Sequence, residues 1–399
     1  MAGSRGSGLA VGMPLDGITV LEVGVFMAGP YATMQLADLG AEVLKVENPT
    51  GGDPVRQAGP FVDGTSSPFA RLNRNKKSVA LDLKSPDGRA AFRRLADRAD
   101  VLVENLRPGA MRGLRLDYET LRQTNPRLIY ASASGWGQDG PLATLPGLDI
   151  MAQARSGLMS ITGEAGGGPA KVGVPVCDLV CGLYVALAVT AALRERDRSG
   201  EGQYIDVSLL ESGVSLAVWE AGKYFATGEV GGPLGTAHQS QAPYQAVRCA
   251  DGWLTVGAIT PKTWLGLCEV LGLQALVDDE RFNDAYRRKE NVAELIPLIE
   301  DVTSMRTVTE LVAALNRAEV PCAPISDYGE VFTADALTKR GFLWDSTDGV
   351  RQLGSPMRLS RTPTQRNAAG PALGADTRAA LLAVGYTNEE IDELVGGQS

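Results

Sequence analysis

The sequence contains one histidine, His238, and only five cysteines. Zinc sites built from several histidines are therefore excluded, and so is any histidine base other than His238. The cysteines are odd in number and scattered, which argues against a disulfide framework and favours a reducing, cytoplasmic compartment. Cys177 and Cys181 have helical spacing, but no neighbouring residues complete a zinc site, so we expect no bound metal.

Positive charge is also scarce, because the chain has 38 Lys and Arg but 47 Asp and Glu, which gives a net charge of −9. An acidic chain is a poor ligand for nucleic acid and for acidic membranes, so we expect neither as a partner. Residues 1–13 are small and Gly/Ser-rich, without the apolar centre of a signal peptide, and we expect a disordered leader there. The remaining composition, 44% hydrophobic and 21% charged, is typical of an ordinary globular enzyme.

Short apolar segments alternate with helical ones in the first half of the chain. Ser85-Pro86-Asp87 has the features of a helix start, with a capping serine, a proline at the first helical position and an acid in the first turn. The alternation predicts a parallel sheet covered by helices on both faces, a Rossmann-like α/β unit. The expected strands are 17–23, 42–47, 78–83, 100–105, 128–132 and 203–207.

The composition changes after a long helix expected at 209–225. A Gly/Pro-rich connection at 228–235 leads into a hairpin across Asp251-Gly252 and then into helices at 263–271, 290–304 and 308–317. We expect a smaller α+β domain at 228–327. The large domain then comprises 14–227 and 328–399, with two helices at the C-terminus.

One carboxylate, Asp178, lies in the otherwise apolar stretch between Lys171 and Arg194. Pro175 can begin a helix there, which places Asp178 in the first turn, where orphan N–H groups and the helix dipole favour an ionised side chain. Two interpretations stay open, an acidic helix cap and a dry, preorganised carboxylate nucleophile. The stretch approaches membrane-spanning length, but Pro175, Asp178 and Gly182 favour a buried core helix.

Two glycine-rich segments resemble nucleotide motifs. Gly135 to Gly140 matches G-x-G-x-x-G, but Pro141 and Pro146 prevent the helix that gives this pattern its meaning. Residues 163–171 lack the G-K-[ST] ending of a P-loop and are interpreted as a mobile lid beside Asp178, with an inert loop as the alternative. Basic residues gather near the predicted strand ends of the N-terminal half, where an anionic nucleotide would fit.

A series of motifs in fixed order covers essentially residues 14–395 and resembles the family III CoA-transferases, the family of formyl-CoA transferase and carnitine CoA-transferase. The segments are Pro14–Gly17, Ala28–Pro30, Leu39–Glu47, Asn73–Ser78, Val103–Asn105, Arg107–Gly109, Ser156–Gly163, Asp178, Gly200–Gln203, Ala242–Tyr244, Asp251–Gly252 and Leu373–Gly374. The resemblance implies a homodimer of two interlocked chains, each with a Rossmann-like large domain built from both chain ends and a smaller domain between them. It also implies that Asp178 is the nucleophile.

The implied chemistry needs no cofactor beyond coenzyme A as substrate. Asp178 would attack an acyl-CoA, pass through an anhydride and an aspartyl-CoA thioester, and hand CoA to a small carboxylic acid. Acyl-CoA racemases of the same family carry a histidine where this chain has Leu148, which can move no proton. Two alternatives remain, a racemase or isomerase and a non-catalytic CoA-binding protein. The binding protein is disfavoured because a charge at Asp178 without a catalytic use would be costly.

Substrate contacts are transferred from the family by position. The segment Gly235-Thr-Ala-His238 is similar to the succinyl-CoA:dicarboxylate branch typified by succinate–hydroxymethylglutarate CoA-transferase, which implies a dicarboxylate acceptor. His238 either touches substrate or only orders its loop. Asn48 departs from members with arginine at that position. The implied CoA contacts are Met27, Ala28, Asn48, Leu81, Lys84, Asn105, Leu106, Arg107 and Arg112.

Overall fold

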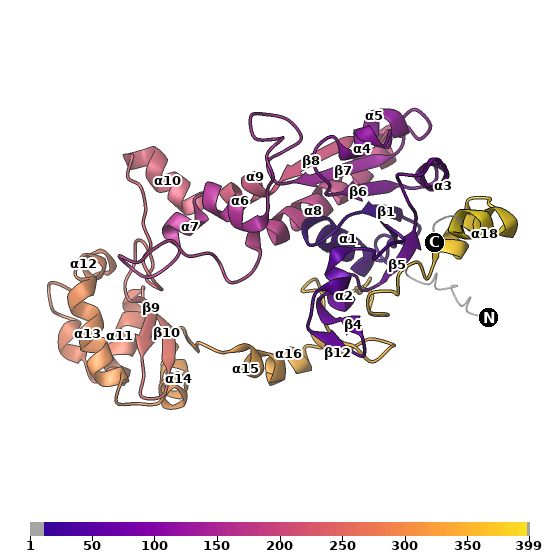
Figure 1. Cartoon of the computed structure of the whole chain (residues 1–399). Helices are drawn as coiled ribbons and strands as arrows, with labels where there is room; N and C mark the ends of the chain where they lie inside the picture. The colour runs from indigo at the N-terminus through magenta and orange to yellow at the C-terminus, as the bar shows by residue number, and fades with distance from the viewer. Residues whose placement is uncertain (1–11, 397–399) are drawn as a thin grey trace, which may run out of the picture. The chain divides into compact units, whose positions relative to one another are not determined.

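The computed structural model describes residues 12–396, which form two compact units (Figure 1). Of the described residues, the first unit contains 12–158, Val172–Ala226 and 335–396; the second contains Met159–Lys171 and Thr227–Ala334. Most of the expected leader, residues 1–11, lies outside the described residues. Residues 159–171 and 328–334, expected in the large domain, group with the second unit. A backbone hydrogen bond from Gly235 to Gly163 (2.8 Å) helps to hold the first of these segments there.

A six-stranded sheet forms the centre of the first unit, and every adjacent pair of strands is parallel, as predicted. The edge strand β5 begins two residues before the expected 78–83 and ends at Ala80. The order across the sheet is β5 (Lys76–Ala80), β2 (Glu42–Glu47), β1 (Thr19–Val23), β6 (Val101–Glu104), β7 (Ile129–Ser134) and β8 (Tyr204–Ser208).

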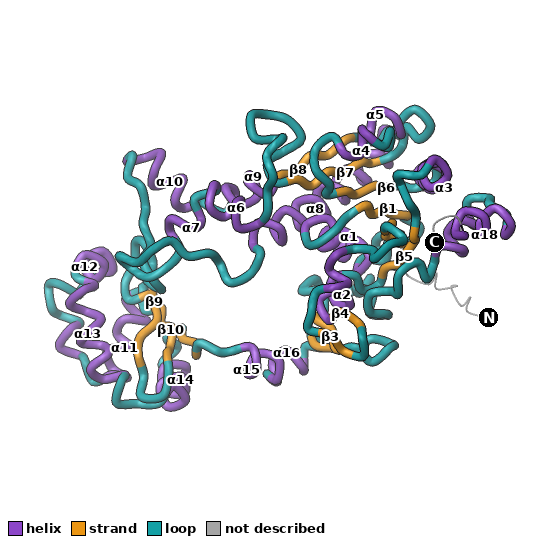
Figure 2. The backbone as a smooth tube through the Cα atoms, in the orientation of Figure 1, coloured by secondary structure: helices purple, strands orange, loops and turns teal. Residues whose placement is uncertain are grey.

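Helices cover both faces of this sheet, because successive strand residues point to opposite sides and both sets are apolar (Figure 2). Val20 packs with α1 (Ala28–Asp38) and α8 (Val176–Ser199) on one face. Leu21 packs with α3 (Pro86–Ala96) and the two C-terminal helices, α17 (Thr377–Ala383) and α18 (Asn388–Gly396), on the other. Helix α3 starts as predicted, with the Ser85 hydroxyl accepting the N–H of Gly88 at 2.9 Å.

The C-terminal segment docks against edge strand β5, so the first unit is assembled from both ends of the chain. The Ser78 N–H donates to the Asp376 carboxylate at 2.9 Å, and the Ala80 N–H donates to the Thr377 hydroxyl at 2.9 Å. These bonds satisfy backbone donors that an open sheet edge would leave unpaired. The other elements of this unit are η1 (Pro54–Gln57), β3 (Phe61–Val62), β4 (Thr65–Ser66), α2 (Ser67–Leu72), α4 (Ala110–Gly113), α5 (Tyr118–Leu121), α6 (Asp149–Arg155), α9 (Leu209–Ser215), α10 (Val218–Thr227), α16 (Asp335–Lys339), β12 (Leu343–Asp345) and β13 (Arg351–Leu353).

The second unit is an α+β fold with its own apolar core around Leu254 and Trp264. Its antiparallel sheet has the order β11 (Cys322–Pro324), β10 (Trp253–Gly257), β9 (Tyr244–Arg248), and the predicted hairpin joins β9 to β10. Its helices are α11 (Pro261–Leu271), η2 (Gln274–Leu276), α12 (Ala285–Glu290), α13 (Val292–Thr303), α14 (Val308–Arg317) and α15 (Tyr328–Thr333), and α7 (Leu158–Ile161) lies where the chain passes from one unit to the other.

One prediction about a helix was wrong in detail, and a second helix, α8, contributes to the core with part of its surface. The helix expected at 209–225 is divided into α9 and α10. The sequence gives no sign of the interruption at Leu216-Ala217, because neither residue is a glycine or a proline. Helix α8 is buried on one side only. By length and composition it meets the criterion for a membrane-crossing helix, and 44% of that apolar window is buried within the chain.

Candidate active site

Asp178 lies in the first turn of α8, three residues after the N-cap Pro175, as predicted. The side chain is half-buried. Burial, and secondarily the negative charge of Asp149, raises the pKa of Asp178 from 3.8 to about 7. Desolvation therefore outweighs the effect of the helix start, which favours the ionised side chain. The result is a carboxylate that is weakly solvated and poised to gain from reaction with an electrophile.

Asp149, a residue that the sequence analysis did not assign, caps the helix that carries Asp178. Its Oδ1 accepts the backbone N–H groups of Cys177 (2.9 Å) and Asp178 (3.2 Å) from the first position of α6. Helix α8 has no capping hydrogen bond from its own N-cap residue, Pro175. Because Asp149 fills the capping role, the interpretation of Asp178 as a helix cap loses its basis. The sequence offers one local signal for Asp149, its place next to Leu148, the position of the racemase histidine.

Gln153 fixes the positions of Asp149 and of the segment that leads into α8. Its side chain is fully buried. Its Nε2 donates to Asp149 Oδ2 at 2.6 Å, and its Oε1 accepts the N–H of Val172 at 2.9 Å. One turn of α6 therefore positions both the cap and the segment that enters the helix.

Neighbouring groups offer little competing chemistry. Cys177 and Cys181 are buried, and burial raises the pKa of their thiols to about 11 and about 12, so neither is a nucleophile at neutral pH. Leu148, at the position of the racemase histidine, is 61% exposed and carries no proton. Within residues 12–396, no group of three or more His, Cys, Asp or Glu side chains is arranged to hold a metal ion.

Four of the transferred CoA contacts come together in one hollow of about 290 Å³ at the carboxyl ends of the strands, here called the strand-end cavity. This is the edge at which open α/β sheets bind ligands. Its walls include the transferred residues Asn48, Leu81, Lys84 and Leu106, together with Val23, Gly24, Val25, Val46, Glu47, Gly52, Asp53, Asp82, Leu83 and Leu114.

The other transferred contacts lie apart from that cavity. Arg107 and Arg112 line a neighbouring hollow of about 350 Å³, beside the buried Glu104, whose pKa burial raises to about 7. Met27 and Ala28 lie where α1 begins. Asn105 turns its amide to the backbone of Val25.

In the second unit, His238 is held by contacts that order its loop. Its ring stacks on Tyr244 with centroids 4.9 Å apart, and its Nδ1 accepts the N–H of Ser240 at 3.2 Å. Lys289 Nζ donates to the His238 carbonyl at 2.7 Å. These contacts support the interpretation in which His238 orders the loop. The Gly235 N–H binds the Gly163 carbonyl, which ties the glycine-rich 163–171 segment to the same loop.

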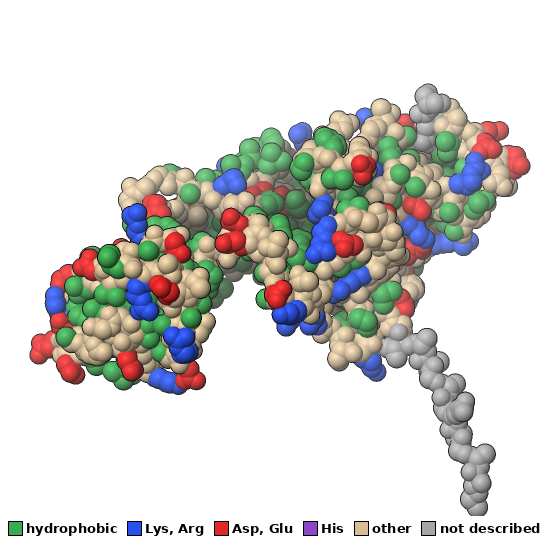
Figure 3. All heavy atoms as spheres, turned by 90° about the horizontal axis from the view of Figure 1, so that it is seen from below, with side chains coloured by type: hydrophobic (Ala, Val, Ile, Leu, Met, Phe, Trp, Pro, Cys, Tyr) green, Lys and Arg blue, Asp and Glu red, His purple; other side chains and the backbone are tan. Residues whose placement is uncertain are grey.

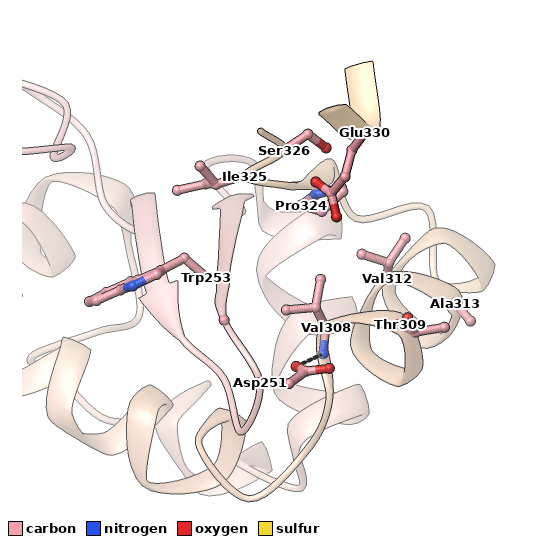
Figure 4. Close-up of a pocket in the computed structure, with 11 residues that line it drawn as sticks. Asp251, Trp253, Val308, Thr309, Val312, Ala313, Pro324, Ile325, Ser326 and Glu330 are labelled. Carbon is pink, nitrogen blue, oxygen red and sulfur yellow. Dashed lines mark hydrogen bonds between the residues drawn. The ribbon is translucent and has the colours of Figure 1, made fainter. Parts of the chain in front are cut away.

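The second unit also has a groove of about 530 Å³ between β10, β11 and α14 (Figure 4). Its lining includes Trp253, Val308, Val312 and Ile325, and the Asp251 carboxylate at one end accepts the Val308 N–H at 2.8 Å. None of the transferred contact residues lines this groove, and we assign it no substrate.

Comparison with known proteins bears on these features. CoA-transferase family III matches residues 15–377. A succinate–glutarate CoA-transferase of Agrobacterium fabrum is 39% identical over 372 residues, covering 90% of this chain and 93% of that protein. An acetyl-CoA:oxalate CoA-transferase of Acetobacter aceti is 36% identical over 348 residues, covering 87% and 89%. The crystal structure of a CAIB/BAIF family protein from Brucella suis has a TM-score of 0.86 at 36% identity and covers 94% of this chain and 100% of its own.

The family match extends from before the first strand to the start of α17 and so includes both units. The solved relative shares the α/β fold with its parallel central sheet. The resemblance inferred from the sequence motifs is confirmed: the chain belongs to CoA-transferase family III and is a CoA-transferase.

Proposed function

We propose that this enzyme moves CoA from succinyl-CoA to a C4–C6 dicarboxylate, with Asp178 as the covalent nucleophile. The observation that carries the proposal is the state of Asp178: a carboxylate at the start of an apolar helix, half-buried, and with its capping role filled by Asp149. Burial raises its pKa to about 7, so the ionised form is destabilised in the empty enzyme, and this cost is relieved when the carboxylate becomes an acyl group.

The reaction proceeds in four balanced displacements. The Asp178 carboxylate attacks the thioester carbonyl of succinyl-CoA, so the C–S bond breaks, CoA leaves as thiolate and a mixed anhydride forms. The thiolate attacks the aspartyl carbonyl, succinate leaves, and an aspartyl-CoA thioester remains. The acceptor carboxylate then attacks this thioester to give a second anhydride and thiolate. The thiolate attacks the acceptor's acyl carbon, which releases the new acyl-CoA and restores Asp178. No metal or redox cofactor takes part.

The nucleotide end of CoA occupies the strand-end cavity in this proposal. The cavity lies at the sheet edge expected for such ligands, and its walls are largely apolar, as an adenine ring requires. Lys84 supplies a cation at the rim for a phosphate. Asn48 brings no charge where family members carry arginine, so Lys84 is the main cation at this cavity.

The acceptor assignment rests on the Gly235-Thr-Ala-His238 segment and on the 39% identical relative, which is named for succinate and glutarate. The relative named for oxalate is 36% identical, so overall identity alone does not decide the acceptor. We propose succinate, glutarate or itaconate ahead of oxalate or a monocarboxylate.

We further propose that the enzyme works as an interlocked cytoplasmic homodimer. Helix α10 has no buried residue, and its Val218 and Phe225 are 78% and 83% exposed. On α8, Leu183 and Leu187 are 48% and 63% exposed. Exposed large apolar side chains on two helices of one unit favour a second copy of the chain as their cover. Figure 3 shows acidic, basic and apolar side chains interspersed on one face, without the continuous basic surface that nucleic acid requires.

Two measurements test the proposal. Wild type and Asp178→Ala are incubated with succinyl-CoA and a panel of carboxylates, and the new acyl-CoA is identified by mass spectrometry. Transfer that falls below about a hundredth in the folded variant supports the nucleophile. Retained transfer refutes it. A best acceptor that is oxalate or a monocarboxylate, by about a hundredfold in kcat/KM, refutes the dicarboxylate assignment and leaves the transferase intact.

A further inference from the structure

The loop that joins β1 to α1 contains a non-glycine residue in the left-handed region. Phe26 has φ +59° although its side chain is 55% exposed and gains little from burial. A phenylalanine populates this conformation about tenfold less than glycine does, so something else must impose it. Residues held in such conformations gather at functional sites, where the surrounding structure enforces them.

Three side chains hold the two peptides on either side of Val25, directly before Phe26. Asn105 binds both polar groups of Val25, since its Oδ1 accepts the Val25 N–H at 2.9 Å and its Nδ2 donates to the Val25 carbonyl at 2.8 Å. Lys45 Nζ donates to the Gly24 carbonyl at 2.8 Å. Asp53 Oδ1 accepts the Phe26 N–H at 3.3 Å.

Two of these three side chains belong to a buried ionic network. The side chains of Lys45, Asp53 and Glu22 are fully buried, and Lys45 lies 2.9 Å from Asp53 and 2.7 Å from Glu22. Buried ion pairs are costly to desolvate and rarely the cheapest way to stabilise a core. Here they place charged groups at fixed positions, where these groups bind backbone atoms of the loop.

The loop lies between the strand-end cavity and the helix of the nucleophile. Gly24 and Val25 line the cavity. At its other end the loop enters α1 at Ala28, whose carbonyl oxygen would lie 2.8 Å from a Cβ placed on Gly182. Gly182 is on α8, one turn after Asp178. A change in the loop therefore moves the cavity wall and the surface against which α8 packs.

We infer that Asn105 is a positioning residue that, together with the Lys45–Asp53 pair, locks Phe26 in the left-handed conformation and so sets the loop between the CoA cavity and α8. This inference rests on the proposed function, and it replaces the direct CoA contact that the family resemblance assigns to Asn105. Each polar atom of its amide already bonds Val25, which fixes the orientation of the side chain toward the loop.

A set of six proteins, the wild type and five variants, separates the two roles. Asn105→Ala is made in wild type, in Phe26→Gly and in Phe26→Ala. The last two remove the same aromatic ring and differ only in their tolerance of φ +59°. The clamp predicts that Asn105→Ala lowers kcat/KM for succinyl-CoA about tenfold in wild type and in Phe26→Ala, but at most about threefold in Phe26→Gly, because glycine keeps the loop conformation unaided.

The dissociation constant of free CoA, measured by calorimetry on the same six proteins, provides a readout besides turnover. An equal loss in all three backgrounds overturns the clamp in favour of a direct contact, and no loss in any background overturns it as well. If Asn105→Ala does not fold by circular dichroism, Asn105→Asp, which keeps the acceptor and loses the donor to Val25, takes its place. A wild type that binds CoA without transferring it refutes the proposed function, and the binding measurements still decide the clamp.

Discussion

Asp178→Asn is expected to make the protein more stable at alkaline pH while it abolishes CoA transfer. The pKa of Asp178 is raised from 3.8 to about 7 in the folded chain, chiefly by burial. The folded state therefore prefers the protonated side chain, and stability is lost as the pH rises from the unfolded pKa to the folded one. Asparagine has nearly the same shape, carries no charge at any pH and avoids this loss.

The size of the effect follows from the two pKa values. Each tenfold change in proton affinity is worth about 1.4 kcal/mol, so the raised pKa of Asp178 lowers the free energy of unfolding, relative to strongly acidic pH, by up to about 4 kcal/mol at pH 8 and by about 1.5 kcal/mol at pH 5. Asp178→Asn should regain most of this difference. A substitution that stabilises a fold and removes activity is the usual signature of a strained catalytic group.

The assay is urea unfolding of both proteins at pH 5 and pH 8 at one protomer concentration, because association contributes to the stability of an oligomer. Only the difference between variant and wild type is used, since Glu104, with a pKa also raised to about 7 by burial, titrates in the same range in both. If the variant gains no more stability at pH 8 than at pH 5, the raised pKa is wrong, and the argument for a desolvated nucleophile fails with it.

Three further outcomes are expected. The kcat/KM for succinyl-CoA should rise with pH through an apparent pKa near 7. Asp149→Asn keeps an oxygen for the two N–H groups but removes the charge, so it should move that midpoint to lower pH. An unchanged midpoint would exclude the Asp149 charge as a contributor to the raised pKa. Exhaustive chelation should leave transfer intact, because the displacements use only a carboxylate and a thiolate; activity lost and then restored by a metal would contradict this. Sedimentation should show a dimer at micromolar concentration, and Leu187→Glu or Phe225→Glu should weaken it, whereas the exposed control Leu265→Glu in the second unit should not; a folded wild-type monomer would refute the interface.

The sequence alone determined the layered α/β architecture and the identity of the candidate nucleophile. Apolar strand patterns predict the sheet regardless of the details of packing, because a parallel sheet must be buried on both faces. Strands such as β2 and β6 lie at or within a residue of the expected positions. Asp178 was recognisable because one carboxylate in a long apolar stretch is costly wherever that stretch folds. The family motifs pointed to the same residue.

Tertiary structure alone decided which residues act on that nucleophile. Asp149 lies 29 positions before Asp178 in the chain, and only the packing of α6 against α8 makes it the cap. Asn105 is 80 positions from Val25, so the clamp on the loop is invisible in any local pattern. The pKa of Asp178 likewise depends on burial by several elements, which outweighs the local helix-start effect that the sequence displays. Local signals report what a segment tends to form, whereas capping, clamping and desolvation arise between segments that meet only in the folded chain.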